Sequence, residues 1–144
     1  RERFEEAARQ AAQESLGYDR YLLDLVQRES EARRHRCIKR FLRESDLPLE
    51  KTLETFDLSR LSPKVVQQVN LVRQGFFLDK HENVLAFGNP GTGKTHLLGG
   101  IAQELVRQGR RIWFSTCALL VQKLLIAKRD LELPQVLKKM SVIP

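Results

Sequence analysis

The sequence is poor in cysteine and has no long apolar run, and both shortages narrow the class of protein. Its two cysteines, Cys37 and Cys117, show no spacing of a metal site or a disulfide framework, which favours a reducing cytoplasm. No stretch approaches the roughly 18 apolar residues of a transmembrane helix, so we expect no membrane partner. The charged N-terminus lacks the apolar stretch of a secretory signal. With 42% hydrophobic residues, the chain can still bury a core.

The net charge of +7 is unevenly distributed along the chain. Residues 1–60 contain 13 Lys/Arg and 13 Asp/Glu, whereas residues 61–144 contain 12 and 5 and so carry the whole excess. Within the neutral first part, one stretch has six cations and no acid: Arg33, Arg34, Arg36, Lys39, Arg40 and Arg43. Such a cluster is typical of nucleic-acid binding, and it is also compatible with a solvated helix face.

Hydrophobic periodicity predicts helices in the first part and alternating strands and helices in the second. Helices are expected over 1–14, 19–44 and 62–75, with the last started by Ser62-Pro63 and residues 48–61 forming a linker. The short apolar runs 83–87 and 111–116 are predicted to be buried strands. Further helices are expected over 95–108, 119–129 and 134–140. This order predicts the opening of an α/β domain with a parallel sheet, whose remainder would lie beyond residue 144.

A glycine-rich segment directly after the first predicted strand carries the chemistry. Residues 88–95, GNPGTGKT, fit the phosphate-loop pattern G-x-x-x-x-G-K-[ST], and a strand before with a helix after is the context that the pattern requires. Glycines let the backbone curl so that its N–H groups point at phosphates, and the helix N-terminus adds a positive end. Lys94 suits the β- and γ-phosphates, and the Thr95 hydroxyl suits Mg²⁺.

The sequence therefore predicts ATP and Mg²⁺ as cofactors. Lys94 and Thr95 are the predicted catalytic residues, and Thr95 is the predicted metal ligand. The residue after the motif, His96, is expected beside the nucleotide as a first-turn helix residue with no catalytic task. The predicted cofactor-binding set is Gly88, Asn89, Pro90, Gly91, Thr92, Gly93, Lys94, Thr95 and His96.

The sequence of residues 83–97, NVLAFGNPGTGKTHL, resembles the corresponding segment of the IstB-type transposition helper ATPases. These are related to the DnaC helicase loaders and the DnaA initiators in the AAA+ superfamily. Residues 51–57 resemble the entry into that family's ATPase domain, residues 109–116 its second strand, and residues 120–124 and 133–139 its next helices. The resemblance covers nearly the whole chain and is strongest over 51–139.

The resemblance implies an α/β fold, the parallel sheet of an AAA+ P-loop NTPase with only its first part present, preceded by a helical module. The implied domains are 1–47 for DNA binding and assembly, 48–61 as a linker, and 62–144 as the first part of the ATPase domain. It implies a cytoplasmic bacterial protein that assembles with ATP into a ring or spiral on double-stranded DNA and activates a transposase. The implied DNA contacts are the cations of residues 33–43 and Lys123, Lys128, Arg129, Lys138 and Lys139.

Two features depart from the family's pattern. The acidic motif that holds Mg²⁺, the sensor residues and the arginine finger are not in this sequence, and the acidic motif is expected just after residue 144. ATP hydrolysis is therefore expected of the full-length protein, whereas this chain alone binds nucleotide and hydrolyses it poorly. In addition, Gly99-Gly100 is unusual inside a helix, because each glycine costs roughly 1 kcal/mol relative to alanine.

Two alternative functions stay open on the sequence alone. A DnaC-like helicase loader would share the ATPase core and would bind a replicative helicase through its N-terminal part. A DNA-binding assembly module would bind nucleotide without hydrolysing it.

Overall fold

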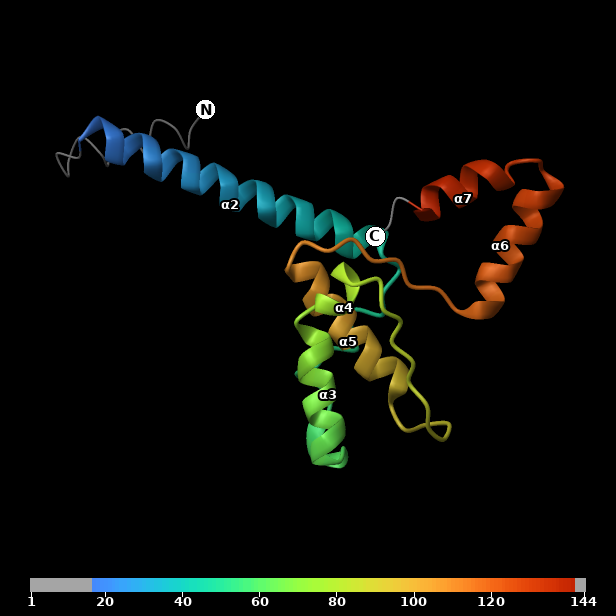
Figure 1. Ribbon diagram of the computed structural model, residues 1–144. Coiled ribbons are helices and arrows are strands. Elements are labelled where there is room, and N and C mark those ends of the chain that lie inside the picture. The colour runs from blue at the N-terminus through green and yellow to red at the C-terminus, as the bar shows by residue number, and fades with distance from the viewer. Residues whose placement is uncertain (1–16, 142–144) are drawn as a thin grey trace. The chain divides into compact units, whose positions relative to one another are not determined.

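The computed structural model describes residues 17–141, and its ordered elements are helices joined by loops (Figure 1). The long helix α2 spans Tyr18–Glu44, and the remaining helices are α3 (Pro63–Arg73), α4 (Phe76–Asp79), α5 (Lys94–Arg107), α6 (Cys117–Arg129) and α7 (Leu133–Ser141), with a 3₁₀ turn at Leu58–Arg60. The backbone divides into two compact units, residues 1–37 and 38–144. The helix predicted over 1–14 lies outside the described residues.

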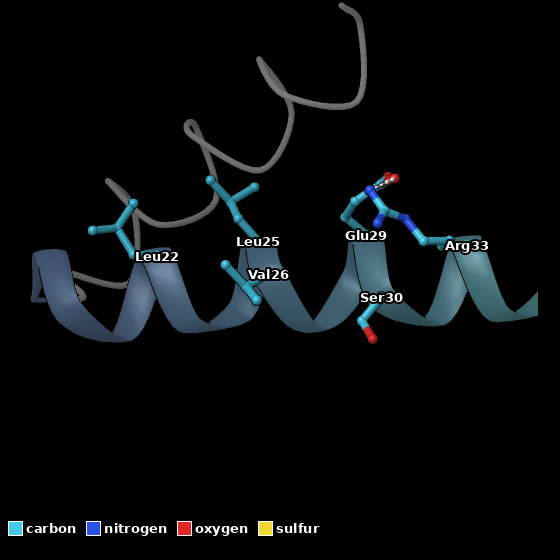
Figure 2. A pocket seen from close by; sticks show the side chains of 6 residues that line it. All are labelled: Leu22, Leu25, Val26, Glu29, Ser30 and Arg33. Carbon is cyan, nitrogen blue, oxygen red and sulfur yellow. Dashed lines mark ion pairs between the residues drawn. The ribbon is translucent and has the colours of Figure 1, made fainter.

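The part of α2 that belongs to the first unit carries ion pairs on a surface of exposed and half-buried residues. Asp24 and Arg28 pair at 2.7 Å across one helical turn, a spacing that brings their side chains together on one face. Along the same stretch, a hollow of about 450 Å³ is lined by Leu22, Leu25, Val26, Glu29, Ser30 and Arg33 (Figure 2). This stretch of α2 contains no buried residue, so its helical form depends on local pairs and side-chain propensity.

The core of the second unit lies where α3 packs against α5. Val69 of α3 and Ile101 and Leu105 of α5 are its buried side chains. The start of α3 is set locally, because the Ser62 hydroxyl accepts from the backbone N–H of the first turn and Pro63 occupies the first helical position. A half-buried ion pair also joins the two helices.

That ion pair has the forked geometry that arginine makes with a carboxylate. Arg73 donates through Nε to one oxygen of Glu104 at 2.6 Å and through Nη2 to the other at 2.9 Å. Gln108 adds a hydrogen bond from its side-chain amide to the Arg73 carbonyl at 3.0 Å. Two parallel donors fix the relative orientation of the helices as well as their distance.

The segment between α2 and the 3₁₀ turn packs along α5. At Gly100, a Cβ atom would lie 2.7 Å from the backbone nitrogen of Leu53, so only glycine permits this approach. The Gln103 side chain is 3% exposed and donates to the carbonyls of Pro48 and Lys51, at 3.0 and 3.1 Å. We call residues 48–56 the strap. Gly99-Gly100 therefore provides room for the strap.

The prediction of a parallel α/β sheet is wrong for the described residues: residues 17–141 contain no strand. A strand forms only where its N–H and C=O groups pair with a neighbouring strand. The segment 83–87 is exposed instead, with Leu85 at 74% and Phe87 at 88%. In the segment 111–116, the Phe114 N–H bonds to the carbonyl of Ser45, in the turn after α2, at 2.7 Å.

The helix predictions for residues 19–44, 62–75, 95–108, 119–129 and 134–140 agree with α2, α3, α5, α6 and α7. The short helix α4 was not predicted, because four residues are too few to show a helical period. Among the residues that the structure describes, no helix is both long enough and apolar enough to cross a membrane.

Candidate functional site: a phosphate-binding loop

The loop over residues 88–93 leads directly into the N-terminus of α5 (Figure 1). Two of its glycines have left-handed backbone conformations, with φ of 79° at Gly91 and 85° at Gly93. Residues with a Cβ rarely adopt this region, so the glycines are needed for the tight curl of the loop. The loop is exposed from Gly88 to Thr92, so a ligand can reach it.

The ammonium of Lys94 lies against the backbone of this loop. Its Nζ donates to the carbonyl of Asn89 at 2.7 Å and to the carbonyl of Gly88 at 2.9 Å, and lies 3.4 Å from Thr92 Oγ1. The Thr92 hydroxyl in turn donates to the Asn89 carbonyl at 2.9 Å. A cation is thus held at the loop, where it can exchange carbonyl partners for phosphate oxygens.

The N-terminus of α5 supplies the donors of the site. Gly93 is the N-cap residue and has no side chain with which to accept a hydrogen bond from the first turn. The first-turn N–H groups have no partner within the helix, and the helix dipole places partial positive charge at the same point. An uncapped helix end, a left-handed glycine and a lysine form the donor set that suits an oligophosphate anion. The exposed Thr95 hydroxyl lies next to them in sequence.

Behind the loop, His96 and Phe56 connect the strap to the start of α5. His96 Nε2 lies 2.9 Å from the Thr52 carbonyl oxygen and 3.0 Å from Thr55 Oγ1. The Phe56 ring meets the His96 ring edge-on, with the centroids 5.3 Å apart. A Cβ at Gly93 would lie 2.8 Å from the Phe56 ring. Sequence reasoning missed these contacts, because the strap shows no periodic pattern.

The sequence is similar to a family of known proteins and to several of its members. The family described as IstB-like ATP binding protein matches residues 1–143. The chain belongs to this family. It is 38% identical over 135 residues to an insertion sequence ATP-binding protein of Sinorhizobium fredii, with 93% of the chain and 45% of that relative covered. This assignment confirms the resemblance inferred from residues 83–97.

Other family members show the same relationship. The chain is 34% identical over 133 residues to the ATP-binding protein of insertion sequence IS21 from Pseudomonas aeruginosa, covering 92% of the chain and 50% of the relative. It is 31% identical over 137 residues to that of IS5376 from Geobacillus stearothermophilus, covering 95% and 55%. The chain thus spans about half the length of these relatives.

The cations that this IstB-like chain was predicted to use for DNA lie on three helices. On the first part of α2, Arg33 and Arg36 both meet the Glu29 carboxylate, at 3.9 and 2.8 Å. Farther along α2, Lys39, Arg40 and Arg43 are exposed. Arg43 lies one turn beyond the other two, so the three share one side of the helix.

The C-terminal cations have more varied surroundings. On α6, Lys123 lies 5.1 Å from the Trp113 ring centroid and 3.9 Å from the carboxylate of Asp46. Arg129 pairs with Asp130 at 3.0 Å. The remaining members, exposed on α6 or α7, are Lys128, Lys138 and Lys139. Lys123 therefore contacts both an aromatic ring and a carboxylate, and its charge is partly offset by Asp46.

Proposed function

We propose that the chain binds ATP with Mg²⁺ through residues 88–96, in a DNA-binding helper protein of transposition. The observation that carries the proposal is the arrangement around Lys94, whose ammonium lies against the loop carbonyls at the uncapped N-terminus of α5. Lys94 would hold the β- and γ-phosphates, and backbone N–H groups of the loop and of the first turn would surround them.

The Thr95 hydroxyl would hold the metal ion beside the phosphates. A Mg²⁺ ion held by this hydroxyl would supply positive charge that offsets the charge of the phosphates. Lys94 and Thr95 are thus the chain's own contribution to hydrolysis by the full-length protein. Family membership supports ATP as the ligand, since the family is described as ATP-binding.

We further propose that the protein assembles as a ring or spiral on double-stranded DNA and activates a transposase. The similarity to ATP-binding proteins of insertion sequences supports a role in transposition. The exposed cations of α2 support DNA as the partner. Because phosphate contacts carry little sequence information, binding through these cations should show low sequence specificity.

The test is ATP turnover by the intact protein, with and without duplex DNA. Lys94→Ala should abolish DNA-stimulated turnover, because it removes the cation that meets the phosphates. The matched control is Lys64→Ala, which removes an exposed lysine from the first turn of α3 and should leave turnover unchanged. ATP binding without turnover in every condition would favour a non-hydrolysing assembly module. Binding to a replicative helicase, with no effect on a transposase, would favour a helicase loader.

The salt dependence of DNA affinity measures how much the cations of α2 contribute to DNA binding. The slope of log K against log salt is about −0.9 per phosphate neutralised. The triple variant Lys39→Gln, Arg40→Gln and Arg43→Gln should therefore make the slope shallower by up to about 2.7 and weaken binding to all sequences alike. Replacing Arg33 and Arg36 instead should have less effect, because both already meet Glu29. An unchanged slope in the triple variant would remove α2 from the DNA interface.

A further inference from the structure

The strap packs along one face of α5, and this face extends from the Pro48 end of the strap to the phosphate loop. A stripe of four positions contacts it, Gly93, His96, Gly100 and Gln103, spaced by three or four residues as one helical face requires, and Gly99 lies next to this stripe against Pro48 and Lys51. The two glycines admit the strap closely, and the two polar side chains bind its carbonyl groups. His96 and Gln103 therefore bind the backbone of the strap, the glycines leave room for its backbone and side chains, and the face begins at the last residue of the phosphate loop.

His96 makes the contact nearest the loop. Since the Thr52 carbonyl oxygen only accepts hydrogen bonds, His96 Nε2 carries the proton and donates it at 2.9 Å. The Thr55 hydroxyl donates to the same carbonyl at 3.0 Å and lies 3.0 Å from His96 Nε2. Three polar groups therefore meet at one point, and the backbone of Phe56 follows directly.

Phe56 connects these hydrogen bonds of His96 to the phosphate loop. Its ring is placed edge-on to His96 and fills the space beside Gly93, where a Cβ would lie only 2.8 Å from the ring. The ring therefore limits how far Gly93 can move. Gly93 has a φ of 85°, and its carbonyl accepts the first backbone bond of α5, from Leu97 at 2.8 Å. Fixing Gly93 fixes the direction of the first N–H groups of α5.

We propose that His96 is a positioning residue for the phosphate loop, acting through the strap: it holds Thr52 and Thr55, which seats Phe56 against Gly93. The proposal rests on the proposed function of the loop in binding ATP. The loop's donors are then oriented before the phosphates arrive, which lowers the ordering cost of binding. By thermodynamic reciprocity, phosphates bound at the loop stabilise the strap.

The first experiment measures the affinities of the intact protein for ATP and for pyrophosphate, together with the thermal unfolding temperature. His96→Ala loses hydrogen bonds that orient the site and should weaken both ligands about tenfold. His96→Gln should restore most of the affinity, because a glutamine amide can donate to the same carbonyl, as Gln103 does farther along α5. The proposal concerns the phosphates, so ATP and pyrophosphate should respond alike.

Gln103→Leu is the matched control. It removes carbonyl contacts of the same kind from the same strap, but about 15 Å along the helix axis from Gly93. It should lower the unfolding temperature and leave both affinities within about twofold of the wild type. Equal losses of affinity in Gln103→Leu and His96→Ala, or no loss in His96→Ala, would overturn the positioning role.

A second measurement needs no variant. Pyrophosphate should slow amide hydrogen exchange at Thr55 and Phe56, whose N–H groups bond to Thr52 Oγ1 and to the Leu53 carbonyl at 3.3 Å each. The Lys51 N–H, at the far end of the strap, should change less. Unchanged exchange at Thr55 and Phe56 with pyrophosphate bound would overturn the proposal.

ATP binding at the loop and positioning by His96 are tested separately by these variants. If the wild type binds neither ATP nor pyrophosphate, or if Lys94→Ala binds as well as the wild type, the proposed function fails and the strap proposal fails with it. If binding depends on Lys94 but not on His96, only the positioning role is overturned.

Discussion

Adjacent glycines in α5 should respond in opposite directions to the same substitution. Gly99 and Gly100 are both buried in the helix, and each faces the strap. A Cβ at Gly99 would lie 3.6 Å from Pro48 Cγ, an ordinary van der Waals distance. A Cβ at Gly100 would lie 2.7 Å from the Leu53 nitrogen and 2.9 Å from Leu53 Cγ. Comparing the two substitutions therefore separates the effect of helix propensity on stability from the effect of packing against the strap.

The magnitudes follow from these distances. Gly99→Ala gains helix propensity without a clash and should stabilise the protein by about 0.5–1 kcal/mol. Gly100→Ala gains the same propensity, but the strap must move by at least about 0.7 Å to reach ordinary contact. Overpacking of this kind costs about 1–3 kcal/mol, and the strap's hydrogen bonds to α5 are worth about 0.5–1.5 kcal/mol each. We expect a net loss of about 2 kcal/mol for Gly100→Ala.

Urea unfolding of the intact protein measures both values. The expected result is a higher midpoint for Gly99→Ala and a lower midpoint for Gly100→Ala, with an unchanged dependence on urea. The difference between the two variants should be about 3 kcal/mol. If Gly100→Ala were as stable as Gly99→Ala, the Leu53 backbone could not lie as close to Gly100 as the structure places it, and the strap contacts described here would be refuted.

Three further changes test separate parts of the structure. Glu104→Gln removes the charge from a half-buried pair and should cost about 1 kcal/mol, with the loss shrinking in high salt; the same cost at all salt concentrations would exclude an ionic contribution from Arg73. The Ser59 hydroxyl and N–H donate hydrogen bonds to the Asp57 carboxylate and hold its pKa below the ordinary 3.8. These bonds therefore stabilise the folded protein above that pH, and this stabilisation is lost as the pH falls through the folded-state pKa. Asp57→Asn should therefore flatten the acid limb of stability against pH, and an unchanged acid limb would refute it. Thr95→Ala should weaken ATP binding with Mg²⁺ present and have little effect in EDTA; equal weakening in both would argue against Thr95 as the metal ligand.

The helices could be predicted from the sequence because their signals are local. Ser62 and Pro63 start α3 as expected, and the apolar stripe of α5 faces the core at Ile101 and Leu105. In both cases, the side chains that determine the element lie within it or directly before it. Family membership was predicted for the same reason, since residues 83–97 carry the motif in one continuous segment.

The strands could not be predicted reliably, because a strand depends on a partner elsewhere in the chain. The runs 83–87 and 111–116 have the length and apolar character of buried strands, but among the described residues they find no strand to pair with. Apolar content alone cannot distinguish a paired strand from an extended segment. Phe114 instead bonds to Ser45, a contact that no local pattern encodes.

The candidate site was only partly visible in the sequence. The phosphate-loop motif identified residues 88–95, and their ligand contacts stay a prediction. The strap was expected to be a plain linker, because its attachment depends on groups of α5 that lie far from it in the chain. Gly99-Gly100 stood out in the sequence only as unusual within a helix, and an unusual pair of glycines does not say which segment packs against it.

The most direct test of the account is the response of backbone amides to ATP in NMR spectra of the intact protein. Saturable shifts at Gly91, Gly93 and Lys94, absent from Lys94→Ala and present in Lys64→Ala, are the result that the account predicts. Shifts confined to residues outside the phosphate loop, or no saturable change with ATP and Mg²⁺ present, would contradict it.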